Sequence, residues 1–243
     1  MRRCLAILPR VGVLAGALVG AVGLLAATAE AGGAVTGTVA FKGTPPPRQH
    51  VNFGGEKACA LIHGDAPPEI ETLIVNDNGT LRWTLVYLKD AAAGAYTPSS
   101  EPVVYSQKGC VFVPHVAAVM AGQPVEVCND DALLHNVRAQ SKQGQSFNLA
   151  QPVQGMKTRR VLSKPEIGIP LKCDVHFWMV AYLHVLPHPF FAVTAADGRF
   201  TLPDVPAGTY TLEAWHETLG VQIQPVTVTD GGTASVEFAF ENP

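Results

Sequence analysis

Short runs in which apolar and polar residues alternate recur along most of the chain. The stretches VTGTVAF at 35–41 and VAYLHV at 180–185 have the period of two that is typical of a half-buried strand. Turn-forming sequences separate the runs, for example NDNG at 76–79 and DGG at 230–232. We expect strands at 35–41, 70–75, 81–88, 111–119, 125–128, 137–139, 167–171, 180–185, 190–194, 199–202, 210–215, 221–228 and 234–240. Only 56–63 and part of 156–163 are expected to form a short helical turn, so the pattern predicts an all-β protein made of β-sandwiches.

Composition supports this fold class and excludes others. Gly 23 and Pro 19 among 243 residues exceed average usage, and they are spread along the chain without a period, which excludes collagen and one long disordered tract. A hydrophobic share of 47% is enough to build a core. The net charge of −3, without a basic block, argues against nucleic acid as a partner.

The first thirty residues have the features of a secretory signal peptide. Arg2 and Arg3 precede an apolar run at 11–27, and small residues close the segment at Ala29-Glu30-Ala31. The run is shorter than the ~20 residues that a membrane span needs, and it contains four glycines. We therefore expect residues 1–31 to be a signal peptide and the cleaved protein to lie in the periplasm, free of the membrane. Cleavage would change the net charge from −3 to −5, because three arginines and one glutamate are lost.

Export leaves four cysteines with two competing interpretations. An even number of cysteines in an oxidising compartment is typical of disulfides, and Cys59, Cys110, Cys128 and Cys173 allow three pairings into two bridges. The alternative is that one of them binds a metal.

The metal interpretation rests on the spacing C-x2-H-x2-M, which is formed by Cys173, His176 and Met179. A short loop with this spacing can present a thiolate, an imidazole and a thioether to one point. His135, in the upstream segment NDDALLHNV at 129–137, would complete a set of two histidines, one cysteine and a weak axial methionine, which is the ligand set of a blue-copper site. Magnesium and calcium do not favour such soft ligands, and zinc gains little from the methionine.

On these residues the stretch from about 103 to 187 resembles a cupredoxin, with a loop similar to that of amicyanin and an HNV segment similar to those of amicyanin and plastocyanin. The resemblance implies one type 1 copper ion, with His135, Cys173 and His176 as equatorial ligands and Met179 as the axial ligand. It implies that Asn136 joins the two ligand loops through hydrogen bonds. Asp174 and Phe177 stand where amicyanin commonly has loop prolines.

If Cys173 is a ligand, three cysteines remain. We favour a Cys59–Cys110 disulfide, because turn residues flank both and both lie outside the proposed loop, and we interpret Cys128 as a small core residue. Under the competing interpretation Cys173 pairs with Cys128 or Cys110.

The remaining residues near the motif are interpreted by their position in the sequence. His115 is interpreted as structural, with a ligand of a second site as the alternative. Phe177 and Trp178 would shield the site or form an apolar docking patch, with electrons passing near a surface-facing His176.

The segment at 194–212 resembles the carboxypeptidase regulatory-like family of transthyretin-type sandwiches, which also resemble carbohydrate-binding-like folds. Its first strand would be the distant 35–39. We therefore expect residues 33–100 plus 190–243 to form one discontinuous sandwich around a cupredoxin at 101–189, with a serial arrangement as the alternative.

The leading functional hypothesis is an exported copper protein that passes single electrons to a redox partner protein. Chains with this layout resemble methylamine utilization proteins, which would link it to amine oxidation. No residue pattern indicates a nucleophile with a base, so we do not expect an enzyme. The alternatives are a non-redox module that binds glycan or protein, and a periplasmic copper carrier.

Overall fold

The computed structural model describes residues 32–91 and 94–242, in which it has sixteen strands and one short helix. The expected all-β class is confirmed. The predicted signal peptide at 1–31 lies outside the described residues. Within the described ranges, no helix has the length and apolar character needed to cross a membrane.

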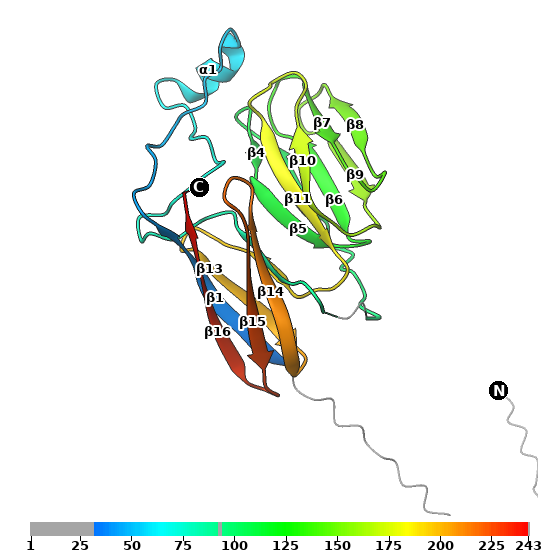
Figure 1. Ribbon diagram of the computed structural model, residues 1–243. Helices are drawn as coiled ribbons and strands as arrows, with labels where there is room; N and C mark the ends of the chain where they lie inside the picture. The colour runs from blue at the N-terminus through cyan, green and yellow to red at the C-terminus, as the bar shows by residue number, and fades with distance from the viewer. Residues whose placement is uncertain (1–31, 92–93, 243) are drawn as a thin grey trace, which may run out of the picture.

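One sandwich, called the flanking sandwich below, is built from two sheets that share a core (Figure 1). Its three-stranded sheet has the order β13-β1-β16, and its four-stranded sheet has the order β12-β2-β14-β15. Val39, Phe200 and Phe238 from the first sheet pack with Leu88 and Leu212 from the second. The strands are β1 (Gly33–Lys42), β2 (Leu85–Leu88), β12 (Phe191–Val193), β13 (Arg199–Val205), β14 (Gly208–His216), β15 (Gly220–Val228) and β16 (Thr233–Glu241).

The second sandwich, called the central sandwich, uses the strands that lie between β2 and β12 in the sequence. A five-stranded sheet, β5-β11-β10-β7-β8, packs on a four-stranded sheet, β4-β3-β6-β9. Tyr105, Val127, Ile169 and Leu183 belong to its core. The strands are β3 (Val103–Gln107), β4 (Phe112–Val113), β5 (Val116–Met120), β6 (Pro124–Asn129), β7 (His135–Ala139), β8 (Phe147–Gln151), β9 (Lys157–Val161), β10 (Glu166–Lys172) and β11 (Val180–Leu186).

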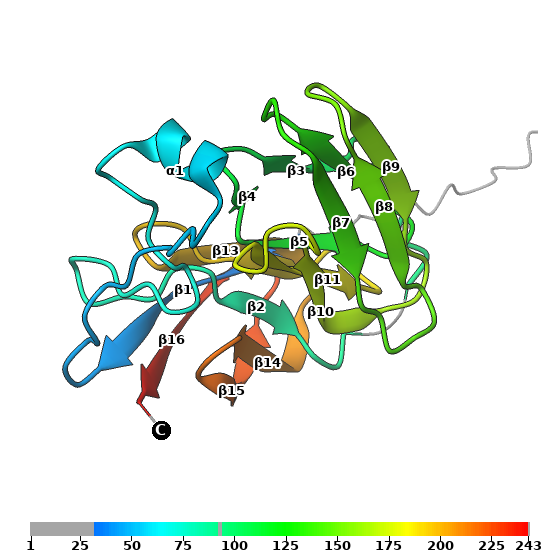
Figure 2. The same ribbon diagram turned by 90° about the horizontal axis from the view of Figure 1, so that it is seen from above.

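The two sandwiches share a small apolar contact (Figure 2). Leu85 and Tyr87 of β2 cluster there with Leu186 of β11. Nearby, the ring of Trp215 lies 4.7 Å from that of His184. His115 Nε2 also contacts the Glu217 carboxylate, which lies in the turn after β14. His115 thus makes a buried polar contact between the two sandwiches.

The helix α1 (Lys57–His63) lies beside β4, at one end of the central sandwich (Figures 1 and 2). The expected helical turn at 56–63 is therefore confirmed. Cys59 is the buried residue of this helix, whereas Leu61 is 82% exposed. Because the helix buries so little apolar surface, it must be held in place by other contacts.

Several expected strands differ from those in the structure. The run at 111–119 is interrupted at the cis peptide before Pro114, which separates β4 from β5. Residues 70–75 do not form the expected strand: Val75 makes an isolated bridge to Leu81, and β2 begins only at Leu85, after Trp83 adopts a positive φ of 65°. The expected helical turn within 156–163 is wrong, because these residues form the edge strand β9.

Candidate metal centre

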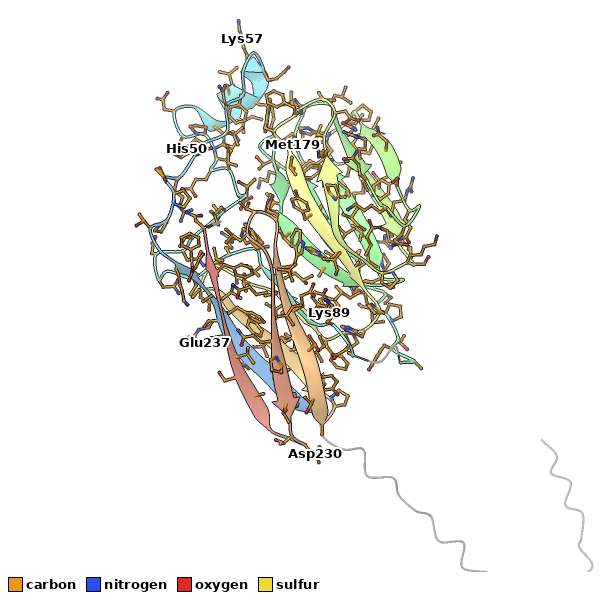
Figure 3. All side chains as sticks on the ribbon, viewed as in Figure 1. His50, Lys57, Lys89, Met179, Asp230 and Glu237 are labelled. Carbon is orange, nitrogen blue, oxygen red and sulfur yellow. A yellow bond between two sulfur atoms is a disulfide. The ribbon has the colours of Figure 1, made fainter. Side chains whose placement is uncertain are left out.

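Two neighbouring strands bring the proposed ligands to one end of the central sandwich. His135 is the first residue of β7, and the loop at 173–179 joins β10 to β11. Because β10 pairs with β7 through Lys172 and Arg138, the start of the loop lies beside the start of β7. The loop is closed by two backbone hydrogen bonds, from the Cys173 amide to the Met179 carbonyl at 3.2 Å and from the Met179 amide to the His176 carbonyl at 2.9 Å. Figure 3 shows Met179 at the end of the sandwich near α1.

The side chains of His135, Cys173 and His176 converge. Their ligand atoms all lie within 4.8 Å of one another. The Nδ1 atoms of the two histidines are 3.0 Å apart, and Cys173 Sγ is 3.8 Å from His176 Nδ1. All three residues are buried, and so is Met179 in the same loop. The structure therefore brings together the thiol and the two imidazoles that the sequence singled out.

The thiol of Cys173 has surroundings that favour the thiolate. Burial alone would raise its pKa, but the neighbouring His135 ring and the backbone amides of Asn136, His176 and Val175 outweigh burial and lower the pKa below its usual value. The Asn136 amide lies 3.5 Å from the sulfur. Since the thiolate is the form that binds metals, Cys173 is prepared for ligation.

The two imidazoles differ in their electrostatic surroundings. Burial would lower the pKa of His135, but Asp131 and Cys173 outweigh this effect and raise it. The pKa of His176 is lowered, first by burial and then by the charge of His135. A neutral imidazole is the ligand form, and the surroundings of His176 favour that form.

The expectation that His176 faces the surface is wrong. Its side chain is only 3% exposed, because the segment that leads into α1 covers it. Cys59 and Cys110 form a disulfide, the pair favoured from the sequence, and a ring nitrogen of His176 and both of these sulfurs lie within 4.8 Å of one another. Phe53 packs edge-on against Trp178, and His63 Nε2 lies 2.7 Å from the Gly109 carbonyl oxygen. We call residues 51–63 the cap.

In the part of the chain that the structure describes, the two other cysteines carry free thiols. Cys128 and Cys173 are both buried and unpaired, so the interpretation with two disulfides is wrong, as is pairing of Cys173 with Cys128 or Cys110. Cys128 is a small buried residue in β6, on the sheet opposite the loop.

Asn136 and Asp174 fasten the loop to β7. Asn136 Oδ1 accepts a hydrogen bond from the Asp174 amide at 2.6 Å, and its Nδ2 donates to Asp174 Oδ2 at 3.1 Å. The Asp174 carboxylate also accepts hydrogen bonds from Arg138 at 2.7 Å and Asn148 at 2.9 Å. These bonds hold the start of the loop beside β7.

The aromatic residues of the loop differ in exposure. Phe177 is 79% exposed, whereas Trp178 is half-buried and donates its indole N–H to the Cys110 carbonyl at 2.9 Å. The ring of Trp178 lies 5.3 Å from that of His176 and 5.2 Å from that of Phe177. The three rings form a contact chain from the buried centre to the surface.

The donor set fits a copper ion. A thiol with a lowered pKa and two imidazoles converge, and the same loop carries the buried Met179; soft sulfur ligands with imidazole suit copper better than magnesium or calcium. Zinc would accept the thiolate and the imidazoles but gains little from the thioether.

A large surface hollow of about 770 Å³ lies away from this cluster, on the outer side of β7 and β8. Arg138, Lys142 and Phe147 line it, and Arg138 is already paired with Asp174. The hollow is open and holds none of the proposed ligands, so the buried cluster remains the candidate site.

Sequence reasoning missed Asp131 and the cap. Asp131 lies four residues before His135, and its carboxylate is bound to that ring in the structure. The acidic pair at 130–131 was visible in the sequence, but the partners of Asp131 across the fold were not. The cap segment showed only a weak helical pattern and a cysteine.

The comparisons with known proteins each cover only part of the chain. Residues 188–236 match the family model described as polysaccharide lyase family 4, domain II, which covers part of the flanking sandwich. A search of curated proteins gives no match.

Several solved structures are similar to part of this chain. A copper-containing nitrite reductase from Thermus scotoductus SA-01 is 25% identical, with a TM-score of 0.33, over 39% of this chain and 24% of its own. A purple cupredoxin from Nitrosopumilus maritimus is 19% identical, with a TM-score of 0.30, over 34% of this chain and 98% of its own. Amicyanin from Paracoccus versutus is 14% identical, with a TM-score of 0.32, over 41% of this chain and 96% of its own. Because these TM-scores are low, the proposed function is based on the geometry of the site.

Proposed function

We propose that this chain is an exported copper protein that transfers single electrons. The observation that carries the proposal is the convergence of Cys173 Sγ with the Nδ1 atoms of His135 and His176 in a buried end of a β-sandwich. Met179 would add the axial thioether. A bound copper ion would supply a one-electron redox couple at this point.

The protein's contribution is a rigid and dry ligand frame. Asn136 joins the two segments that carry the ligands, and the loop is closed by its own backbone hydrogen bonds. His135, Cys173, His176 and Met179 are each at most 3% exposed, which excludes water from the centre. Ligands that cannot move keep reorganisation small when charge changes, as fast electron transfer requires.

Burial of the ligands also favours electron transfer over the alternative of a copper carrier. A carrier must hand its metal to an acceptor, which needs ligands that an incoming protein can reach. Here the cap covers the His176 side of the centre and is held by a disulfide. The frame therefore favours a retained ion over a delivered one.

The route for the electron follows from the covered histidine. Since His176 does not reach the surface, the contact from His176 through Trp178 to Phe177 provides the way out. Phe177 would then be the docking point for a redox partner protein.

The compartment and the domain arrangement enter the same proposal. We propose the periplasm as the compartment, on the basis of the sequence at 1–31. The flanking sandwich, at 33–100 plus 190–243, would be a regulatory-like unit that carries the copper domain at 101–189; β1 pairs with both β13 and β16, which supports this assignment.

Addition of Cu(II) to the purified apo-protein tests the function. We expect an intense visible band from charge transfer between the Cys173 thiolate and copper, which is lost on reduction and absent in Cys173→Ser. Cys128→Ser is the matched control, because it removes the other free thiol and should keep the band.

Two results would contradict the proposal. One is a wild-type protein without the band. The other is a band that survives in Cys173→Ser, which would show that the thiolate is not a ligand. Binding of Cu(I) alone, with ready transfer to a chelator, would favour the carrier.

A further inference from the structure

We propose that Asp131 is a positioning residue for the metal centre, which fixes the ring of His135 and directs its Nδ1 atom to the ion. The inference rests on the proposed copper site, and it adds a residue that does not touch the ion itself.

The carboxylate of Asp131 has three donors. Its Oδ1 accepts a hydrogen bond from the Gly109 amide at 2.7 Å, and its Oδ2 accepts from the Cys110 amide at 2.8 Å and from His135 Nε2 at 2.9 Å. Asp131 is only 6% exposed, so water does not replace these partners. The backbone of Asp131 is held as well, because its amide donates to Asn129 Oδ1 at 3.0 Å.

These bonds fix the chemical form of the His135 ring. A carboxylate can only accept, so the hydrogen on His135 must be on Nε2 when the ring is neutral. The lone pair is then on Nδ1, the atom that lies 3.0 Å from His176 Nδ1. Carboxylate partners of metal-binding histidines select the tautomer in this way and increase the basicity of the ligand.

The surroundings of Asp131 suit a carboxylate anion. Two backbone amides and the His135 ring donate hydrogen bonds to its oxygens, and a carboxylate can only accept them. A fixed negative charge behind His135 favours the more positive, oxidised ion over the reduced one. Asp131 should therefore affect Cu(II) binding more than Cu(I) binding.

One of the residues that hold Asp131 is also bonded to the cap. Cys110, whose amide donates to Oδ2, is joined to Cys59 of α1, and its carbonyl accepts the indole N–H of Trp178. One turn thus contacts the cap, the ligand loop and the carboxylate that holds His135.

The first test is the affinity of Asp131→Asn for each copper ion, by competition with chelators specific for Cu(II) and for Cu(I). We expect a 10–100-fold loss of Cu(II) affinity, as is typical of such partners, with the visible band retained. Cu(I) affinity should change much less. The reduction potential should then rise by about 59 mV for each tenfold loss of Cu(II) affinity relative to Cu(I) affinity. The control is Asp130→Asn, because that exposed neighbour contacts Ser106 and does not contact His135. Equal affinities and potentials in Asp131→Asn and wild type would overturn the inference.

The second test needs neither copper nor a variant. In the wild-type apo-protein, at a pH where the ring is neutral, ¹⁵N NMR should find the His135 hydrogen on Nε2. A hydrogen on Nδ1 would overturn the inference even if Asp131→Asn failed to fold. Because this readout is independent of the visible band, failure of the proposed function and failure of the role of Asp131 give different results.

Discussion

Removal of the Cys59–Cys110 disulfide by Cys59→Ala with Cys110→Ala should destabilise the central sandwich and release the helix of the cap. The bridge joins residues separated by 51 positions in the sequence. For a loop of this length, the chain-entropy relation gives about 4 kcal/mol of stabilisation through the unfolded state. In a protein of this size, a loss of about 4 kcal/mol lowers Tm by about 8–16 °C.

The helix of the cap has little else to hold it. Cys59 is the buried residue of α1, while Leu61 and Ile62 are 82% and 50% exposed. A helix of seven residues is not stable in isolation. Val51 and Phe53, before the helix, are buried in the core of the central sandwich, so they should stay in place without the bridge. The helix would keep the contact of His63 with Gly109, so its local opening should precede global unfolding.

Differential scanning calorimetry and amide hydrogen exchange measure the two effects. Calorimetry should show a lower transition temperature for the central sandwich and little change for the flanking one. Hydrogen exchange should increase in residues 57–63. Cys128→Ala is the control, because it removes a buried thiol that closes no loop. A Tm within about 3 °C of wild type, with unchanged exchange in the cap, would refute the reasoning.

Two further predictions concern pH and the surface. Burial lowers the pKa of His184 to about 3. Burial, together with the neighbouring His115, lowers the pKa of His216 to about 4. Below pH 6.5 these two histidines therefore bind protons in the unfolded chain but not in the folded one. The free energy of unfolding should therefore fall by about 2 kcal/mol for each histidine between pH 6.5 and 4.5, as measured by denaturant titration; a profile in His184→Asn as steep as that of wild type would contradict this. Phe177→Ala should slow electron self-exchange of the copper-loaded protein, as measured by NMR line broadening, whereas Ile223→Ala on the flanking sandwich should not; equal rates would exclude Phe177 as the exit.

The parts of the fold that the sequence predicted well are the strands with one buried face. In β16, Val236, Phe238 and Phe240 alternate with exposed or half-buried residues, and the pattern is visible without any knowledge of the fold. The edge strand β9 has the sequence KTRRV and is mostly exposed, so it carries no apolar period. Its strand conformation comes from pairing with β6, which is a long-range contact.

The candidate site likewise has some features that the sequence could predict and others that depend on long-range contacts. Cys173, His176 and Met179 lie close together in the sequence, so their spacing could indicate a shared point. Asp131 is held by amides that lie 21 and 22 residues upstream, and backbone amides have no signature in the side-chain sequence. The covered position of His176 depends on Cys59, which lies more than a hundred residues upstream, and only the fold shows that the disulfide lies beside the ring.

In the proposed copper protein, one centre would be both closed to solvent and connected to the surface through aromatic contacts. The cap closes the centre on the His176 side, so a partner cannot contact this ligand directly. Trp178 belongs to both functions, because its indole N–H is bonded to Cys110 at the base of the cap while its ring contacts His176 and Phe177. Because the indole of Trp178 is held by this hydrogen bond and by its two ring contacts, it excludes water and still offers a path of contacts to the surface. Closure of the site and the route of the electron therefore depend on the same residue, and a change that loosens Trp178 should affect both together.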